Sequence, residues 1–211
     1  MKFDKAMKQV KQYEYVDLGL PSGLKWAKCN VGAEKETDYG DYFMWGSVTP
    51  NTANECNWES YTHCNGPYDT LTKYNTSTLY GVNPDNITTL ESVDDAATQI
   101  MGDDWKMPKM NDFIELLNGT TNEWITNFNG TGVNGMKFTS KTDTSKYIFI
   151  PAAGYCHNGS VYSVDGNSYV WSSSLGTANP SEAWYLGFYS DYCYMHYYSR
   201  CYGRSVRGVK D

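Results

Sequence analysis

Short stretches of alternating hydrophobic and polar residues recur along this chain of 211 residues, and they predict short β-strands. The first two, residues 13–18 and 25–30, are joined by Leu20-Pro-Ser-Gly23, a turn in which Pro presets φ and Gly tolerates positive φ. Residues 184–189 alternate Trp, Leu and Phe with Tyr and Gly, which predicts a half-buried strand. Further strands are expected at residues 41–45, 136–139, 147–150 and 206–209, the second and third of them as a hairpin.

Helical periodicity is found only in the middle of the chain, where it predicts two helices. Ser92 and Asp95 resemble a capping box, with Asp where Glu or Gln is usual, and the first helix runs from there to Gly102. The second helix begins after Pro108 and ends at Gly119. Its apolar residues are expected on one face: Phe113, Ile114, Leu116 and Leu117.

The order of these elements, strands followed by two helices and then further strands, predicts an α+β fold. We expect a loop-rich domain in which the two helices pack on short, mostly antiparallel strands, with Trp105 between the helices filling the core. Residues 47–90 are polar and predict a long surface insertion with little regular structure. A loop of this length in a compact domain is often functional.

Charge and hydropathy exclude some classes of function. The net charge of −7 argues against a nucleic-acid-binding protein, because no basic field is present to hold phosphates. No apolar run approaches the ~20 residues of a membrane span. Residues 1–10 lack the apolar centre of a signal peptide. We therefore expect a protein without a membrane span that reaches the cell exterior by another route, as a virion part would, or after removal of a leader.

The six cysteines form no Cys-x-x-Cys pair, and their spacing fits no zinc site. Cys56 and Cys64 flank a turn-like stretch and could form a disulfide. Cys29 and Cys156 lie in strand-like contexts and are expected as small buried hydrophobic residues.

Candidate catalytic and metal-binding groups are few. The three histidines are dispersed, so no metal site is expected, and no cofactor-binding or catalytic motif is present. Cys193 and Cys201 could form a disulfide or a redox pair, but only Arg200 and His196 lie near them to lower a thiol pKa. The favoured interpretation is a protein that is not an enzyme.

The segment 190–202 has an unusual composition. It holds five tyrosines, two cysteines and two serines but no Ala, Val, Leu or Ile, and no hydrophobic period of 2 or 3.6 explains it. Tyr with Ser is the composition of an antibody paratope, in which rigid amphipathic rings supply contact area. A solvated hairpin with aromatic cross-strand pairs is the alternative. We favour a contact surface.

Six blocks of sequence, in order along the chain, also form a recognisable pattern. They are Val16–Gly32, Tyr39–Gly46, Trp105–Pro108, Pro151–Tyr155, Trp171–Ser174 and Ser205–Arg207. Together they resemble the Fibrobacter-succinogenes-type major paralogous domain, a family common in Bacteroidetes and their phages. The resemblance implies a C-type-lectin-like fold over residues 13–211, after an N-terminal extension at 1–12 and with the insertion at 47–90. Lys109, where the family usually has Thr or Ser, and Gly208, where Pro is usual, depart from the pattern.

The same resemblance implies a function for the tyrosine-rich segment. Some members of the family are variable proteins of diversity-generating retroelements, in which mutagenesis at adenines of AAC codons varies the residues that contact ligand. The ligand-binding residues implied are Gly187, Tyr189, Asp191, Tyr192, Cys193, Tyr194, His196, Tyr197, Tyr198, Ser199, Cys201, Tyr202 and Arg204. The residues expected to stay fixed are Phe188, Met195, Gly203, Ser205 and Val206.

The sequence thus leads to a specific hypothesis about function. We expect a non-enzymatic receptor-binding protein of a phage tail or a bacterial surface, which binds a protein or glycan on a target cell and needs no cofactor. Replacing Tyr194, Tyr197 and Tyr198 with Ala is expected to abolish binding and to leave the melting temperature nearly unchanged. An undiversified adhesin or lipoprotein domain of the same family is the alternative, and an oxidase of the formylglycine-generating type is a remote one.

Overall fold

The computed structural model of the protein describes residues 12–190 and 192–211, so that residues 1–11 of the expected N-terminal extension lie outside it. The described residues form a mixed α+β fold of mostly antiparallel strands and two α-helices, as predicted. The strands are β1 (Tyr15–Asp17), β2 (Lys25–Ala27), β3 (Thr120–Ile125), β4 (Gly135–Ser140), β5 (Tyr147–Pro151), β6 (Tyr155–His157), β7 (Ser160–Tyr162), β8 (Asn167–Leu175), β9 (Glu182–Tyr189), β10 (Tyr192–Ser199) and β11 (Val209–Lys210). The helices are α1 (Ala96–Met101) and α2 (Met110–Gly119), with short 3₁₀ turns η1 (Ser92–Asp94) and η2 (Phe128–Gly130).

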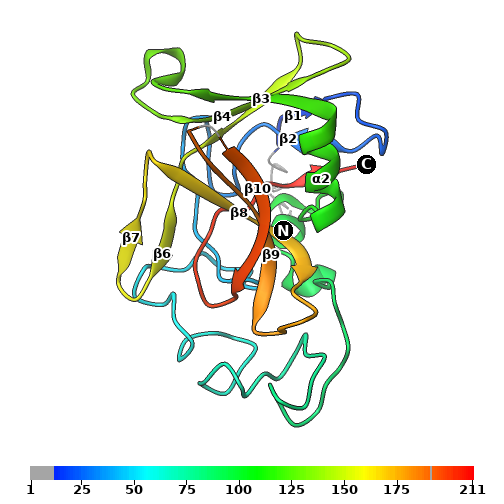
Figure 1. Ribbon diagram of the computed structural model, residues 1–211, viewed down its shortest axis with the longest axis vertical. Helices are drawn as coiled ribbons and strands as arrows, with labels where there is room; N and C mark the ends of the chain where they lie inside the picture. The colour runs from blue at the N-terminus through cyan, green and yellow to red at the C-terminus, as the bar shows by residue number, and fades with distance from the viewer. Residues whose placement is uncertain (1–11, 191) are drawn as a thin grey trace, which may run out of the picture.

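Four small sheets make up the β-structure of the described chain (Figure 1). The sheet β10-β9-β8 lies at the centre, the sheet β3-β4-β5 lies at one end, and the hairpin β6-β7 lies to one side. The sheet β1-β2-β11 joins the two ends of the described chain, because β1 and β11 both pair with β2. The predicted hairpin is confirmed. A C-terminal strand closes the sheet, but it covers Val209–Lys210 and not 206–209, and the two N-terminal strands are also shorter than expected.

Helix α1 is confirmed, but its first turn differs from the expected capping box. Asp95, not Ser92, is the N-cap, and its carboxylate accepts a hydrogen bond of 2.9 Å from the Thr98 amide. The same carboxylate accepts from the Met107 amide at 2.8 Å and so ties the helix to the connector that follows. Burial raises the pKa of Asp95. Trp105 in this connector is buried, as predicted.

Helix α2 begins and ends close to the predicted positions, but Ile114, which was expected on the apolar face, is exposed to solvent. Phe113 and Leu116 are buried and Leu117 is partly buried against the same core, whereas Ile114 is exposed. Successive residues of a helix are about 100° apart, so the stripe at i, i+3 and i+4 from Phe113 leaves Ile114 to one side. The stripe packs on the central sheet together with Leu186 of β9.

Two strand predictions are corrected. Residues 41–45 form no strand and make a single bridge, Phe43 with Arg204. Backbone hydrogen bonds to Arg204 and Arg200 hold the segment, and the side chain of the buried Trp45 donates to the Ser172 carbonyl at 2.8 Å. Residues 184–189 are not a half-buried strand. They lie in β9, the central strand of its sheet, and most of them are buried because core side chains cover both faces.

The insertion at 47–90, whose residues are all described, contains turns and isolated bridges but no strand or helix, as predicted. It is nevertheless more than surface. Its buried residues Tyr61, Tyr74 and Leu90 join core clusters shared with the rest of the molecule. The segment forms the layer of loops at the lower end of Figure 1. Polar composition concealed this role, because the buried tyrosines carry hydroxyl groups that are hydrogen-bonded inside the protein.

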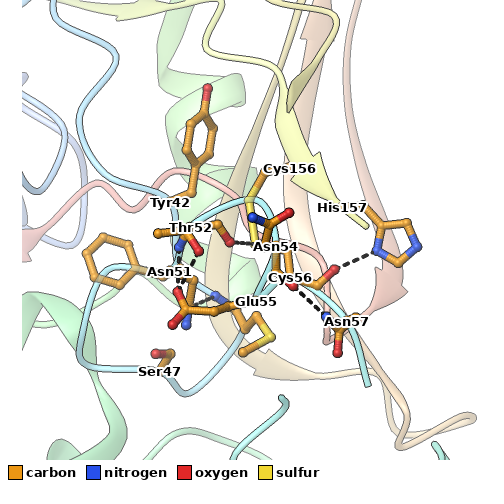
Figure 2. The surroundings of a disulfide bond; sticks show 12 residues. Tyr42, Ser47, Asn51, Thr52, Asn54, Glu55, Cys56, Asn57, Cys156 and His157 are labelled. Atoms are coloured by element: carbon orange, nitrogen blue, oxygen red, sulfur yellow. Dashed lines mark hydrogen bonds between the residues drawn. A yellow bond between two sulfur atoms is a disulfide. The ribbon is translucent and has the colours of Figure 1, made fainter. Parts of the chain in front are cut away.

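The possible Cys56–Cys64 disulfide does not form. Cys56 bonds to Cys156, 100 residues later, and the two Cα atoms are 6.2 Å apart (Figure 2). Cys64 is free and its thiol donates to the Trp58 carbonyl at 3.2 Å. Cys156 is therefore not a simple buried hydrophobic residue, and Cys29 is half-exposed. No helix in the described part of the chain is long and apolar enough to cross a membrane.

Candidate functional site

The tyrosine-rich segment is a regular strand. As β10, it pairs antiparallel with β9 over its whole length, from Tyr192 opposite Tyr189 to Ser199 opposite Glu182. An alternation of period 2 is therefore present, although no aliphatic residue marks it. Cys193 and Met195 take the positions that face the core on one side of the strand, and tyrosines occur on both sides.

One side of the central sheet carries most of the tyrosines, and we call it the tyrosine face. In the observed register, side chains from β8, β9 and β10 lie side by side on it. These are Tyr169, Tyr185, Tyr189, Tyr192, Tyr194, His196 and Tyr198. Neighbouring rings contact one another, for example Tyr192 stacked on Tyr194 with centroids 5.5 Å apart and Tyr169 edge-on to Tyr185 at 5.6 Å.

The opposite side of the sheet packs on helix α2, and two of the predicted ligand-binding residues lie there. Cys193 is partly buried against the α2 core, next to Met195. Tyr197 lies on the same side, with its ring 5.0 Å from that of Trp184, and it remains exposed. The predicted ligand-binding residues of β10 are thus divided between two faces.

Three other predicted ligand-binding residues are buried: Gly187, Cys201 and Arg204. Gly187 lies beneath the ring of Tyr194, where a Cβ atom would be 2.5 Å from the Tyr194 Cζ atom. Cys201 belongs to the core cluster around the disulfide. Ser199 and Tyr202 are half-buried, and Asp191 lies outside the described residues.

A pocket of about 210 Å³ opens on the tyrosine face, and we call it the tyrosine pocket. Its lining consists of Tyr155, Tyr169, Tyr185, Tyr194, Tyr198, Tyr202 and Arg204. Sequence reasoning included the last four in the site and missed the first three. The alternation of residues 184–189 indicates Tyr185, because Trp184, Leu186 and Phe188 lie on one side of a strand and Tyr185 lies on the other.

The disulfide supports the wall of the pocket that β6 provides. Cys156 and Gly203 exchange backbone hydrogen bonds of 2.8 and 2.9 Å, which hold β6 beside the chain that follows β10. Gly203 is packed against both sulfur atoms, so a Cβ atom there would collide with the disulfide. Next to it, the rings of His157 and Tyr202 stack at 3.9 Å, and His157 contacts the Cys56 carbonyl at 2.9 Å (Figure 2).

Among the described residues that line the pocket, Arg204 is the only charged one. It is 3% exposed, and its guanidinium carbon lies 3.8 Å from the ring centroid of Tyr185 and 4.5 Å from that of Trp171. Burial lowers its pKa. Burial also raises the pKa of Tyr194 and of Tyr202, so both hydroxyls are protonated at neutral pH and can donate and accept hydrogen bonds.

Cys193 and Cys201 do not form the suggested disulfide or redox pair. They belong to different core clusters, one beside α2 and one beside the Cys56–Cys156 bond, and both thiols are free. Burial raises the pKa of Cys193 to about 12 and that of Cys201 to about 11. Both thiols are therefore protonated at neutral pH, unlike a reactive cysteine. Among the described residues, no three His, Cys, Asp or Glu side chains gather where they could hold a metal ion.

Comparisons of the chain with protein-family models, with curated proteins and with solved structures find no match. The function is therefore argued from the tyrosine face itself.

Proposed function

We propose that this protein is a non-enzymatic ligand-binding protein that attaches to a molecule on a target-cell surface through the tyrosine face. The observation that carries the proposal is the exposure of tyrosines on a face that also contains a pocket. Tyr189 is 42% exposed, Tyr192 56% and Tyr198 43%, and all three lie on one side of a single sheet. Exposed aromatic groups gathered in this way are typical of an interaction surface.

The construction of the sheet favours binding. Tyrosine offers a large ring for contact and a hydroxyl for specificity, and it has few rotatable bonds to order. The strands that carry the tyrosines are anchored on their other side by Leu186, Phe188 and the buried stripe of α2. A rigid support of this kind lowers the entropy cost of binding.

A C-type-lectin-like fold and diversification by a retroelement are part of the proposal. Aromatic residues of the family-like blocks, such as Trp26, Trp45 and Trp171, are buried in the core, as expected of a scaffold. Phe188 and Val206, expected to stay fixed, are also fully buried. The disulfide is typical of proteins in an oxidising environment, which favours a virion or a bacterial cell surface as the location.

An undiversified adhesin or lipoprotein domain would have the same geometry, so the DNA of the locus distinguishes it. Diversification requires a nearby copy of the coding sequence for the C-terminal end that differs mainly at adenines, together with a reverse transcriptase gene. Absence of both would leave the binding function and remove the diversification. The oxidase alternative requires a reactive thiol, and the raised pKa values of Cys193 and Cys201 give it no support.

Binding itself can be tested on arrays of purified bacterial surface polysaccharides and surface proteins. The labelled protein should bind a subset of spots, and the double variant Tyr192→Ala/Tyr198→Ala should lose at least tenfold in signal. The control is Tyr68→Ala, which removes a tyrosine of similar exposure (52%) in the insertion. Melting temperatures should agree within a few degrees. Equal binding by both variants would refute the proposed site, and a large loss of stability in the double variant would assign these tyrosines to the core.

A further inference from the structure

Three arginines near the C-terminal end are buried in the protein: Arg200, Arg204 and Arg207. In two of them, Arg200 and Arg207, every side-chain nitrogen donates a hydrogen bond to a neutral acceptor. Arg200 donates to the Tyr61 hydroxyl at 2.7 Å and to the Pro180 carbonyl at 2.7 Å, and it makes further bonds to backbone carbonyls of the insertion. Such contacts satisfy a buried guanidinium without a carboxylate.

Arg207 follows the same pattern. Its Nε atom donates to the Asn30 side chain at 2.9 Å, and its terminal nitrogens donate to the carbonyls of Ala27 at 2.9 Å and Phe149 at 3.0 Å. The fold therefore provides acceptors where a buried arginine serves only to hold segments together.

Arg204 is different, although it is equally buried. Its Nε and Nη1 atoms have no hydrogen-bond partner among the described residues. The faces of the aromatic rings around it attract its charge, but they provide no hydrogen-bond acceptor for Nε or Nη1. A buried charged donor without an acceptor is unfavourable. Arg204 also lines the tyrosine pocket, so an anion that enters the pocket can supply the missing hydrogen-bond acceptor.

We infer that the tyrosine pocket binds the carboxylate-bearing ring of an acidic sugar, with Arg204 as its counter-ion. The inference rests on the proposed function and names the chemistry of the ligand. Arginine matches a planar carboxylate through paired hydrogen bonds. A sugar ring presents apolar C–H faces to the tyrosine rings and hydroxyl groups to the tyrosine hydroxyls, which are both donors and acceptors.

The size of the pocket agrees with a single sugar unit. At about 210 Å³ it is smaller than the ~300–1,000 Å³ of sites for drug-sized ligands. A Glu or Asp side chain from a protein partner could reach Arg204, but it would leave the faces of six tyrosine rings largely uncovered. The net charge of −7 supplies no long-range attraction for anions, so selectivity has to come from contacts within the pocket.

The test uses sodium glucuronate and glucose at matched ionic strength, with binding followed by two-dimensional NMR and by melting temperature. Glucuronate should bind saturably and at least tenfold more tightly than glucose. Arg204→Met should remove this preference, and Arg204→Lys should retain part of it. Lys137→Met is the matched control, because Lys137 also lies over a tyrosine, 4.4 Å from the ring centroid of Tyr147, but outside the pocket. This variant should bind glucuronate like the wild type.

Several outcomes would overturn the inference. Equal affinity for glucuronate and glucose, or an unchanged preference in Arg204→Met, would show that Arg204 does not select the ligand. Tighter binding of sulfate, phosphate or an acetylated Glu-containing peptide would assign the pocket to another anion. If Arg204→Met does not fold, the Nε–H signal of Arg204 in the wild type decides, because it must shift on addition of glucuronate and not of glucose. Array binding that glucuronate does not compete would refute this inference and leave the proposed function intact.

Discussion

Among single residues, Gly187 matters for the tyrosine face because its missing Cβ atom leaves room for the ring of Tyr194. In Gly187→Ala the new Cβ atom would be 2.5 Å from the Tyr194 Cζ atom, so the tyrosine ring has to move. We expect a loss of about 1–3 kcal/mol in the free energy of unfolding. In a Tyr194→Ala background the same substitution should cost almost nothing, because the colliding ring is absent. Denaturant unfolding of the four proteins measures this coupling.

A matched control for this cycle is Gly166→Ala, where the new Cβ atom would lie 3.6 Å from the nearest heavy atom, the Ser163 carbonyl oxygen. It should leave stability nearly unchanged. An equal cost of Gly187→Ala with and without the Tyr194 ring would show that the collision is not the cause.

His63 makes the stability of the protein sensitive to pH. It is buried between the rings of Tyr61 and Tyr74, with its Nε2 atom 3.7 Å from the Asp94 carboxylate. Burial, against the weaker attraction of Asp94, lowers the pKa of His63 below its usual 6.5. Below pH 6.5 the unfolded chain therefore binds a proton that the folded protein does not, so stability is fully present above that pH and decreases as the pH falls.

The matching variant is His63→Phe, which keeps an aromatic ring and removes the titrating group. Between pH 7 and pH 5 the wild type should lose at most about 1.4 kcal/mol per pH unit through this residue, and the variant should lose less. Parallel pH profiles of wild type and His63→Phe, measured by urea unfolding, would contradict the assignment.

Among the helices and strands, those with a clear hydrophobic period and clear end signals are predictable from the sequence. The helices α1 and α2 and the hairpin β4-β5 have the periodicity and end signals of their classes. Strand β10 lacks aliphatic residues, so only its pairing with β9 makes its alternation evident. Hairpin β6-β7 was also missed, although Asn158 and Gly159 have positive φ values of 45° and 85° and form the Asn-Gly pair typical of a tight hairpin turn.

The tyrosine pocket was predictable only in part, because its lining comes from strands that are distant in the sequence. Its wall on β10 was found from composition, whereas Tyr155 and Tyr169 come from other strands that meet it only in the folded protein. The burial of Arg204 could not be anticipated, because charged residues are usually exposed unless they are paired.

The disulfide is expected to stabilise the protein and to hold the β6 wall of the pocket. It closes a segment of 100 residues, and removal of a native disulfide typically costs about 2–5 kcal/mol. We expect a loss of this order in Cys56→Ser/Cys156→Ser, together with weaker binding of glucuronate, because β6 then loses its covalent link to the insertion and keeps only hydrogen bonds and ring contacts. Cys64→Ser, which removes a free thiol of the same loop, should change neither quantity. A double variant as stable as the wild type would show that the insertion is held in place without the bond.

At the scale of the whole molecule, the insertion and the sheet are built as one unit. The two larger core clusters lie mainly on opposite sides of the central sheet, and the insertion contributes Tyr74 and Leu90 to one of them. Cys56 and Tyr61 of the insertion form a third cluster with Cys156 and Cys201. Arg200, at the end of β10, reaches into the insertion and bonds to the Tyr61 hydroxyl. Composition alone predicts a surface insertion, and only these long-range contacts show that it belongs to the core.

Tyr61→Phe, which removes one oxygen atom, tests whether the insertion and the central sheet unfold together. The Tyr61 hydroxyl donates to the Trp45 carbonyl at 2.7 Å and accepts from Arg200, so its removal leaves a buried acceptor and a buried charged donor unsatisfied. We expect a loss of about 1–3 kcal/mol or somewhat more, and a single thermal transition that moves as a whole in calorimetry. Tyr68→Phe, in the same segment but exposed, should leave the transition in place. If Tyr61→Phe instead splits the melting curve into two transitions, the insertion unfolds independently of the sheet that carries the tyrosine face.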